Sequence, residues 1–265
     1  CDFKGEWAEP LVRARAATVR ILKSTFTSGN KPVLDCDGAG QVDFVANRFS
    51  NRDMVTNTVR VQSSGSVNFS ECVFDNCSLA ENAVILDGNG SCMFKGNHFR
   101  NCEFSGAQTF VVGRFYDVTF IENELRALNL VTAGGTGFMV EAMDSITLMR
   151  NEFARVAGVG AYSTALRFRS MRAQLNGNNF IDNTAVTLIT AASNNIAINP
   201  DSYYRNEKSP VLLAFYGRKG EMPSNLEILN CRFRKNTPAT YFDVRAFGNA
   251  TIHKNIFEGG DLDDT

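Results

Sequence analysis

The sequence has few of the residues that many functional classes depend on. Its 265 residues include one tryptophan, two histidines and six prolines. No apolar run approaches the ~20 residues of a membrane-spanning helix. The 27 basic and 28 acidic residues leave a formal net charge of -1, so no overall field directs the protein to nucleic acid or to a membrane. We therefore expect no membrane span and no nucleic-acid partner.

Phenylalanine, in contrast, is abundant, and most of its 21 copies fall on a sequence repeat. The stretch Val42–Phe49 reads apolar, x, apolar, x, x, Asn-like, x, aromatic. Copies of this pattern begin at residues 19, 42, 67, 92, 118, 146, 173, 196, 226 and 250, which lie 23 to 30 residues apart. Self-similarity at this period is typical of a solenoid, in which each repeat forms one coil.

Each copy has the periodicity of a short β-strand. Its first and third positions are apolar and face one side, and its second position faces the other. A second β-rich run follows in nearly every copy, for example Val84–Leu86 and Phe110–Val112. We therefore predict an all-β domain over residues 1–265, with coils that stack through parallel strands ~4.8 Å apart.

The sixth and eighth positions predict the interior of the solenoid. The eighth position is aromatic in nine of the ten copies, which predicts an internal aromatic stack. Stacked amides at the sixth position would satisfy backbone groups where the chain bends. The residues of this predicted amide ladder are Asn47, Asn97, Asn123, Asn151, Asn178 and Asn255.

These repeats resemble the right-handed parallel β-helix of the pectate-lyase-like superfamily. The Phe-x-x-Asn element, present as Phe44–Asn47, Phe94–Asn97 and Phe120–Asn123, is similar to the repeats of chlamydial polymorphic outer-membrane proteins and related protist surface proteins. The Gly-Gly-Ala-Ile motif that accompanies it in the outer-membrane family is absent. The resemblance implies a right-handed parallel β-helix of about ten to eleven coils and an extracellular or cell-surface location.

The two ends of the sequence match the interior of a coil. Cys1-Asp2-Phe3 fits positions six to eight of a copy, and few residues follow Phe257. We therefore expect the chain to be a segment of a longer protein. Cys1 could alternatively be the first residue of a mature lipoprotein.

The seven cysteines show no metal-ligand spacing. Cys77 and Cys102 both lie at position eleven of consecutive copies, so they should be one coil apart. That separation falls within the ~4.4–6.8 Å range of Cα distances in disulfides. The sequence therefore allows either a Cys77–Cys102 disulfide or a stacked pair of free thiols.

The resemblance implies where an active site would lie, because polysaccharide-degrading members use clustered carboxylates, often with calcium, on adjacent coils. Position seven carries such a constellation, with His98, Glu124 and Glu152 on three consecutive coils and Arg150 nearby. Two carboxylates ~4.8 Å apart would raise the pKa of one of them, as a general acid requires, or bind calcium. The alternative is a solvated ladder of Glu–Arg salt bridges.

Arginines that fall on or just after the last strand of their repeats form a second surface feature. Stacking in register would align them as a stripe that binds an acidic glycan. The alternative is ordinary charge that discourages strand-edge pairing. The residues of this basic stripe are Arg114, Arg167, Arg169, Arg172 and Arg218.

We therefore expect a non-catalytic β-helical segment of a larger extracellular or cell-surface protein with an adhesive or structural role. Its partners would be polysaccharides or other cell-surface components. We expect no cofactor, with a calcium ion at Glu124 and Glu152 as the alternative. Two alternatives stay open. One is a polysaccharide lyase, hydrolase or epimerase with its site along Arg100–Glu152 or in residues 128–137. The other is a rigid component of a large assembly.

Overall fold

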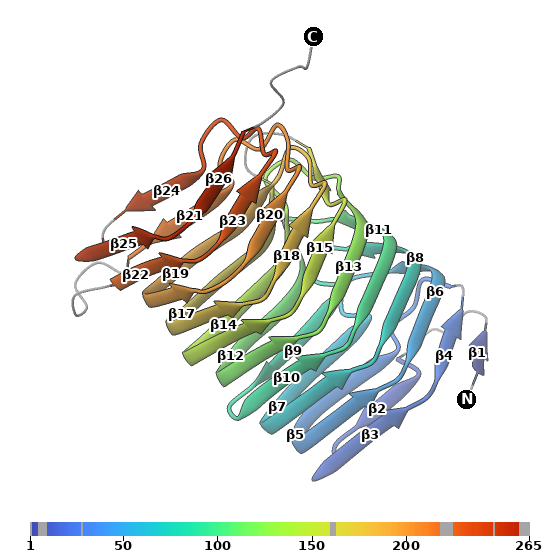
Figure 1. Ribbon diagram of the computed structural model, residues 1–265. Coiled ribbons are helices and arrows are strands. Elements are labelled where there is room, and N and C mark those ends of the chain that lie inside the picture. The colour runs from blue at the N-terminus through green and yellow to red at the C-terminus, as the bar shows by residue number, and fades with distance from the viewer. Residues whose placement is uncertain are drawn as a thin grey trace.

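The computed structural model describes residues 2–4, 10–27, 29–159, 163–217, 225–245 and 247–259. Every regular element in these ranges is a β-strand, and the strands pair in parallel. They wind into an elongated solenoid that runs from β1 (Asp2–Lys4) at one end to β26 (Ile256–Glu258) at the other (Figure 1). No helix in the described ranges has the length and apolar character of a membrane span.

One sheet, which we call sheet A, receives one strand from each successive coil. Between β1 and β26 its main path contains β4 (Thr25–Thr27), β6 (Arg48–Met54), β8 (Val73–Ala80), β11 (His98–Ser105), β13 (Glu124–Leu130), β15 (Glu152–Ala154), β18 (Asn179–Ile181), β20 (Ser202–Tyr204) and β23 (Arg232–Arg234). The short strand β16 (Ala157–Gly158) pairs with β13 beside this path.

The second sheet, sheet B, holds the remaining strands. Its main path is β2 (Val12–Ala14), β5 (Leu34–Val45), β7 (Val59–Ser70), β10 (Ser91–Lys95), β12 (Gln108–Ile121), β14 (Thr136–Met149), β17 (Thr164–Asn176), β19 (Thr187–Ile198), β21 (Leu213–Tyr216) and β24 (Phe242–Arg245). Beside this path lie β3 (Thr18–Leu22), β9 (Val84–Gly88), β22 (Asn225–Leu229) and β25 (Asn249–His253).

The long strands of sheet B turn a corner in mid-strand. The register between β5 and β7 shifts at Ala39, and the register between β12 and β14 shifts on either side of Phe115. In the coil of β9 and β10, the strand is interrupted at the same place. A bulge bends a strand and redirects its side chains. We call this edge the bulge corner, and it comprises residues 37–41, 62–66, 87–91, 113–117, 141–145 and 169–172.

Two further bends in each coil use left-handed backbone conformations. The backbone angle φ is positive at position five of the copies, as in Ala46 (56°) and Glu122 (57°), and at position ten, as in Asn76 (53°) and Asn101 (52°). A residue with a Cβ atom loses roughly 1–2 kcal/mol in this conformation. Interactions inside the bends must therefore offset this conformational cost.

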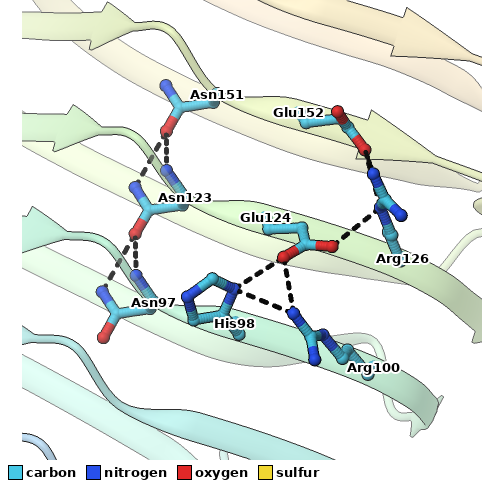
Figure 2. A network of polar contacts seen from close by, with 8 residues as sticks. All are labelled: Asn97, His98, Arg100, Asn123, Glu124, Arg126, Asn151 and Glu152. Atoms are coloured by element: carbon cyan, nitrogen blue, oxygen red, sulfur yellow. Dashed lines mark hydrogen bonds and ion pairs between the residues drawn. The ribbon is translucent and has the colours of Figure 1, made fainter.

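An asparagine ladder fills the first of these bends (Figure 2). Asn123 Oδ1 accepts hydrogen bonds from the backbone N–H of Asn97 at 2.9 Å and from its Nδ2 at 3.0 Å. Asn123 Nδ2 donates to the carbonyl of Phe94 at 2.9 Å and to Asn151 Oδ1 at 2.8 Å. The same bonds continue through Asn178 to Asp201.

Asn47 and Asn255, the first and last asparagines of the predicted ladder, do not belong to this continuous run. Cysteines at the sixth position separate them from it. Asn47 binds the backbone of Ser24 and Ile21, and Asn255 binds the backbone of Cys231 and Ile228. Between Asn47 and Asn97, Cys72 donates its thiol to the carbonyl of Phe44 at 3.4 Å. The thiol therefore takes the place of the Nδ2 donor of an asparagine.

The predicted aromatic stack is confirmed, and it forms two columns in the core. In the eighth-position column, the rings of Phe74 and Phe99 are 4.4 Å apart and nearly parallel. A second column contains Phe69 and Phe94 at 5.4 Å. Leu125 interrupts the eighth-position column, which resumes with Phe153, Phe180, Tyr203, Phe233 and Phe257.

The second bend contains another polar ladder, which the sequence analysis missed. Asn206 Oδ1 accepts hydrogen bonds from the backbone N–H and the Nδ2 of Asn183, and Asn236 Oδ1 does the same for Asn206. These three asparagines all lie at position eleven of their copies, five residues after the sixth position. Reading that column in full would have revealed the ladder.

The cysteine pair for which the sequence allowed either a disulfide or two free thiols occupies this same column. Cys77 and Cys102 are buried free thiols, so the disulfide is not formed. Cys102 donates to the carbonyl of Phe74 at 3.6 Å, just as Asn183 donates to the carbonyl of Phe153. The thiols therefore serve as hydrogen-bonding members of the ladder. A hydrogen bond with Cys102, together with burial, raises the pKa of Cys77, which favours the uncharged thiol.

Candidate functional site

The position-seven column lies on sheet A, as predicted. Parallel pairing of β11, β13 and β15 places His98, Glu124 and Glu152 opposite one another on consecutive coils. Figure 2 shows these side chains on the outer surface. His98 Nδ1 lies 2.7 Å from Glu124 Oε2, so these two groups share a hydrogen bond.

Arginines neutralise both carboxylates of this column. Arg126 Nε lies 2.8 Å from Glu124 Oε1, and its Nη2 lies 2.6 Å from Glu152 Oε1, so one guanidinium bridges the two coils. Arg100 Nη2 donates to Glu124 Oε2 at 2.9 Å. Burial by itself raises the pKa of Glu124, but the hydrogen bonds from Arg100 and His98 outweigh it and lower the pKa. Glu124 is therefore ionised, whereas a general acid must be protonated.

Arg150 does not join the column. It turns to Glu122, where its Nη2 lies 2.7 Å from Glu122 Oε1. Among the described residues, no group of three or more His, Cys, Asp or Glu side chains could hold a metal ion. The geometry of Glu124 and Glu152 thus corresponds to the salt-bridge ladder, the alternative to the acid or calcium interpretations.

The segment 128–137, considered as a loop for the enzyme alternative, is half strand and half loop. β13 ends at Leu130 and β14 begins at Thr136, so only residues 131–135 connect them. A Cβ atom on Gly137 would lie 2.9 Å from the carbonyl oxygen of Ala165 and 3.3 Å from Leu130. Gly137 is therefore packed against its neighbours, whereas Val131, Ala133 and Gly134 of the loop are exposed.

Replacing Glu124 with glutamine should have a small effect. Its partners are half-exposed arginines, and ion pairs in water-accessible positions contribute ~0–1 kcal/mol each. We expect the free energy of unfolding at pH 7 to fall by no more than about 1 kcal/mol, as measured by urea denaturation. The lowered pKa means that this contribution is present at neutral pH and is lost as the pH falls through the pKa of the folded state. A loss of several kcal/mol would contradict the salt-bridge interpretation. Glu103→Gln, an exposed glutamate of the same sheet, is the matched control.

Cavities occur at a different place, on sheet B along the bulge corner and on the strand residues that lead into it or out of it. One of about 590 Å³ is lined by Arg13, Arg15, Asp35, Asp37 and Arg60 among others. The next, of about 300 Å³, shares Asp37 and extends to Arg114. Two more follow along the corner, of about 280 Å³ beside Arg169 and about 220 Å³ beside Arg172.

The predicted basic stripe is only partly assembled. Arg114 and Arg169 line the same cavity with Glu141 and Met143, and Arg172 lines the next one. Arg114 donates to Asp87 and Arg172 to Asp144, so two of the predicted charges are compensated. The Nε atom of Arg167 is buried and has no hydrogen-bond partner among the described residues. Arg218 lies outside the described residues.

The polar groups between these arginines were not identified from the sequence. Asp37, Gln62 and Asp87 lie opposite one another on consecutive coils, and Ser63 and Asn89 line the same cavity. Asp37, Gln62 and Asp87 each lie five residues before the start of a copy, so reading that position in consecutive copies would have aligned them. Only the tertiary structure places Ser63 and Asn89 beside them.

The comparisons with known proteins identify the family. The family model for the right handed beta helix region matches residues 11–165 and 114–261, so the chain belongs to this family. No curated protein matches the chain. Among solved structures, the Streptococcus pneumoniae surface protein and adhesin PfbA is similar at 10% identity, over 92% of this chain and 89% of that chain. The TM-score is 0.23, and at this value the similarity carries no inference about function.

Proposed function

We propose that this chain is a non-catalytic, adhesive β-helix of an extracellular or cell-surface protein, and that it binds polysaccharide chains along the bulge corner. The observation that carries this proposal is a group of four cavities along and beside one edge of the rod, between β2 and β17. A row of small sites along a rod suits an extended polymer better than a single compact molecule.

The groups in these cavities match the chemistry of sugars. Carboxylates, amides and hydroxyls bind sugar hydroxyls, and guanidinium groups bind acidic substituents. Tyr116 and Met143 are exposed large apolar side chains on neighbouring coils of the corner. A tyrosine ring can pack against the apolar face of a sugar while its hydroxyl stays in water. The corner therefore combines polar and apolar contacts for one ligand.

Rigid strands also favour binding. The corner is built on β5, β7, β12, β14 and β17, whose inward side chains are packed in the core. Side chains anchored on such strands lose less conformational freedom on binding than side chains of an unstructured loop.

The non-catalytic part of the proposal rests on the position-seven column. Catalysis by a carboxyl pair requires one group to hold its proton near neutral pH. Glu124 has a lowered pKa, and Arg126 bridges it to Glu152. This arrangement supports a structural role for the column.

A binding and cleavage assay tests the proposal. The purified chain is titrated against a panel of immobilised neutral and acidic polysaccharides, and the same polymers are assayed for new chain ends after incubation. We expect binding without cleavage. Arg169→Gln should weaken binding severalfold, because this exposed side chain lines a corner cavity. Arg232→Gln, on an exposed arginine of sheet A, should leave binding unchanged.

Two results would contradict the proposal. Chain cleavage that Glu124→Gln abolishes would establish the enzyme alternative. Absence of binding to every polymer would remove the adhesive function and favour a rigid structural component.

A further inference from the structure

The first cavity of the bulge corner differs from the others in its charge. Three arginines and two aspartates line its volume of about 590 Å³, so one positive charge is uncompensated. It lies on the first coils, where Arg13, Asp35 and Arg60 are opposite one another on β2, β5 and β7. Its volume is within the range of ~300–1,000 Å³ that is usual for ligand sites.

The three arginines of this cavity differ in how firmly hydrogen bonds and ion pairs fix their side chains. Arg60 Nη1 donates to Asp35 Oδ1 at 2.8 Å, and its Nη2 donates to Gln62 Oε1 at 2.7 Å, so this guanidinium is fixed in position. Arg13 Nε lies 3.9 Å from Asp35 Oδ2. Arg15 is exposed and forms no ion pair with another described residue. Because its side chain is exposed, its guanidinium is accessible to a ligand.

The second cavity adjoins the first at Asp37 and has the opposite character. Its volume is about 300 Å³, and it is lined by Asp37, Gln62, Ser63, Asp87, Asn89 and Arg114, with two glycines. Arg114 neutralises Asp87, whereas Asp37 has no hydrogen-bond partner among the described residues. This cavity therefore offers hydrogen-bond acceptors and amide donors to a neutral group.

We propose that these two cavities form one two-part site for an acidic polysaccharide. The carboxylate or sulfate of one sugar binds Arg15 and Arg60 in the first cavity. The hydroxyls of the adjoining sugar bind Asp37, Gln62 and Asn89 in the second. This inference rests on the proposed function and names its ligand class and its place on the rod.

The charges of the two cavities determine which sugar of the ligand binds in which cavity. A planar guanidinium binds a carboxylate or sulfate through two parallel hydrogen bonds, which favours the anionic group in the first cavity. The second cavity contains two aspartates and one arginine, whereas the first contains two aspartates and three arginines, so an anion is repelled from the second cavity and attracted to the first. An acidic sugar therefore occupies the arginine side, and a hydroxyl-rich sugar occupies the aspartate side.

Three polymers distinguish the chemistry of the ligand. Polygalacturonate carries carboxylates, heparin carries sulfates, and dextran carries neither. Their affinities for the chain are measured by biolayer interferometry at fixed ionic strength. We expect one or both acidic polymers to bind at least tenfold more tightly than dextran. Arg15→Gln should reduce this affinity about tenfold while leaving the weaker binding of dextran unchanged.

Two further variants test the second cavity and the location. Asn89→Ala should weaken binding of acidic polymers severalfold, because it removes a contact to the neutral sugar. Arg232→Gln removes an equal charge from sheet A and should have no effect. Circular dichroism of each variant verifies that the coils are folded; all three substituted side chains are exposed, so the fold should be retained.

The outcomes separate this inference from the proposed function. Acidic polymers that bind the wild type and Arg15→Gln equally would overturn the site but retain the adhesive function. An equal loss for Arg15→Gln and Arg232→Gln would show non-specific charge attraction and would also overturn it. Tighter binding of duplex DNA than of either acidic polymer, lost in Arg15→Gln, would assign the site to nucleic acid instead. Failure of all polymers to bind would overturn both proposals.

Discussion

Replacing Asp201 with asparagine should stabilise the protein at pH 8 by up to about 4 kcal/mol. Asp201 takes the sixth position of its copy, inside the first ladder, and is only 3% exposed. Its Oδ1 accepts hydrogen bonds from the backbone N–H of Asn178 at 2.8 Å and from its Nδ2 at 3.1 Å. An asparagine could accept the same bonds without placing a charge in the core.

The sign of this effect follows from the pKa of Asp201. Burial raises the pKa to about 7 from an ordinary value of 3.8, and the hydrogen bonds from Asn178 and Tyr203 only partly oppose it. The folded state therefore binds the proton more tightly than the unfolded state. The resulting stabilisation is complete below about pH 3.8 and is lost as the pH rises to about 7. A shift of about three units, at ~1.4 kcal/mol each, gives the expected magnitude.

Urea denaturation at pH 4.5, 6 and 8 measures the effect. The stability advantage of Asp201→Asn over the wild type should be small at pH 4.5 and should increase steadily to pH 8. Asp182→Asn is the control, because Asp182 is a partly exposed partner of Arg205 and should show no comparable increase. Parallel pH profiles for the wild type and Asp201→Asn would show that the carboxyl is not buried in the ladder.

Replacing Asn123 with alanine should destabilise the protein by about 4 kcal/mol, among the largest effects of a single substitution. Asn123 is buried at the centre of the continuous ladder, and its side chain takes part in four hydrogen bonds. Its removal leaves the backbone N–H of Asn97 and the carbonyl of Phe94 without their partners. Each buried group left unsatisfied costs ~1–3 kcal/mol.

The midpoint and slope of urea unfolding, followed by circular dichroism, measure this loss. Asn129→Ala is the matched control, since Asn129 is exposed on β13 and should change stability by less than about 0.5 kcal/mol. An equally small effect of Asn123→Ala would show that the ladder contributes little to stability. The bends would then be held by the backbone hydrogen bonds between coils and by the aromatic columns.

The solenoid could be predicted because its determinants recur in every copy. Phe74 and Phe99 occupy the same position of consecutive repeats, and parallel stacking places equal positions over one another. The same argument predicted that His98 and Glu124 would meet across β11 and β13. It did not predict how the pair would be used, because Arg100 and Arg126 reach it from two positions further along the strands. Long side chains can turn to several partners, and periodicity does not select among them.

The cysteine pair shows the same limit. Position eleven of the copies correctly placed Cys77 and Cys102 in one column of the core. Whether two stacked thiols join or bind carbonyls depends on the directions of their side chains. In the structure Cys102 binds the carbonyl of Phe74, so the column serves as a ladder.

The sequence alone determined the parallel coils, the aromatic columns and the register of sheet A, because each depends on residues that repeat at equal positions. The cavities of the bulge corner, in contrast, could be located only in the tertiary structure. There the strands bend at bulges of variable length, so Arg15, Asp37 and Asn89 occupy no common position in the repeat. Residues without a shared period, such as Arg15 and Asn89, meet only when the chain is folded, whereas Asp37 and Gln62 of the same proposed site are one 25-residue repeat apart and pair across β5 and β7.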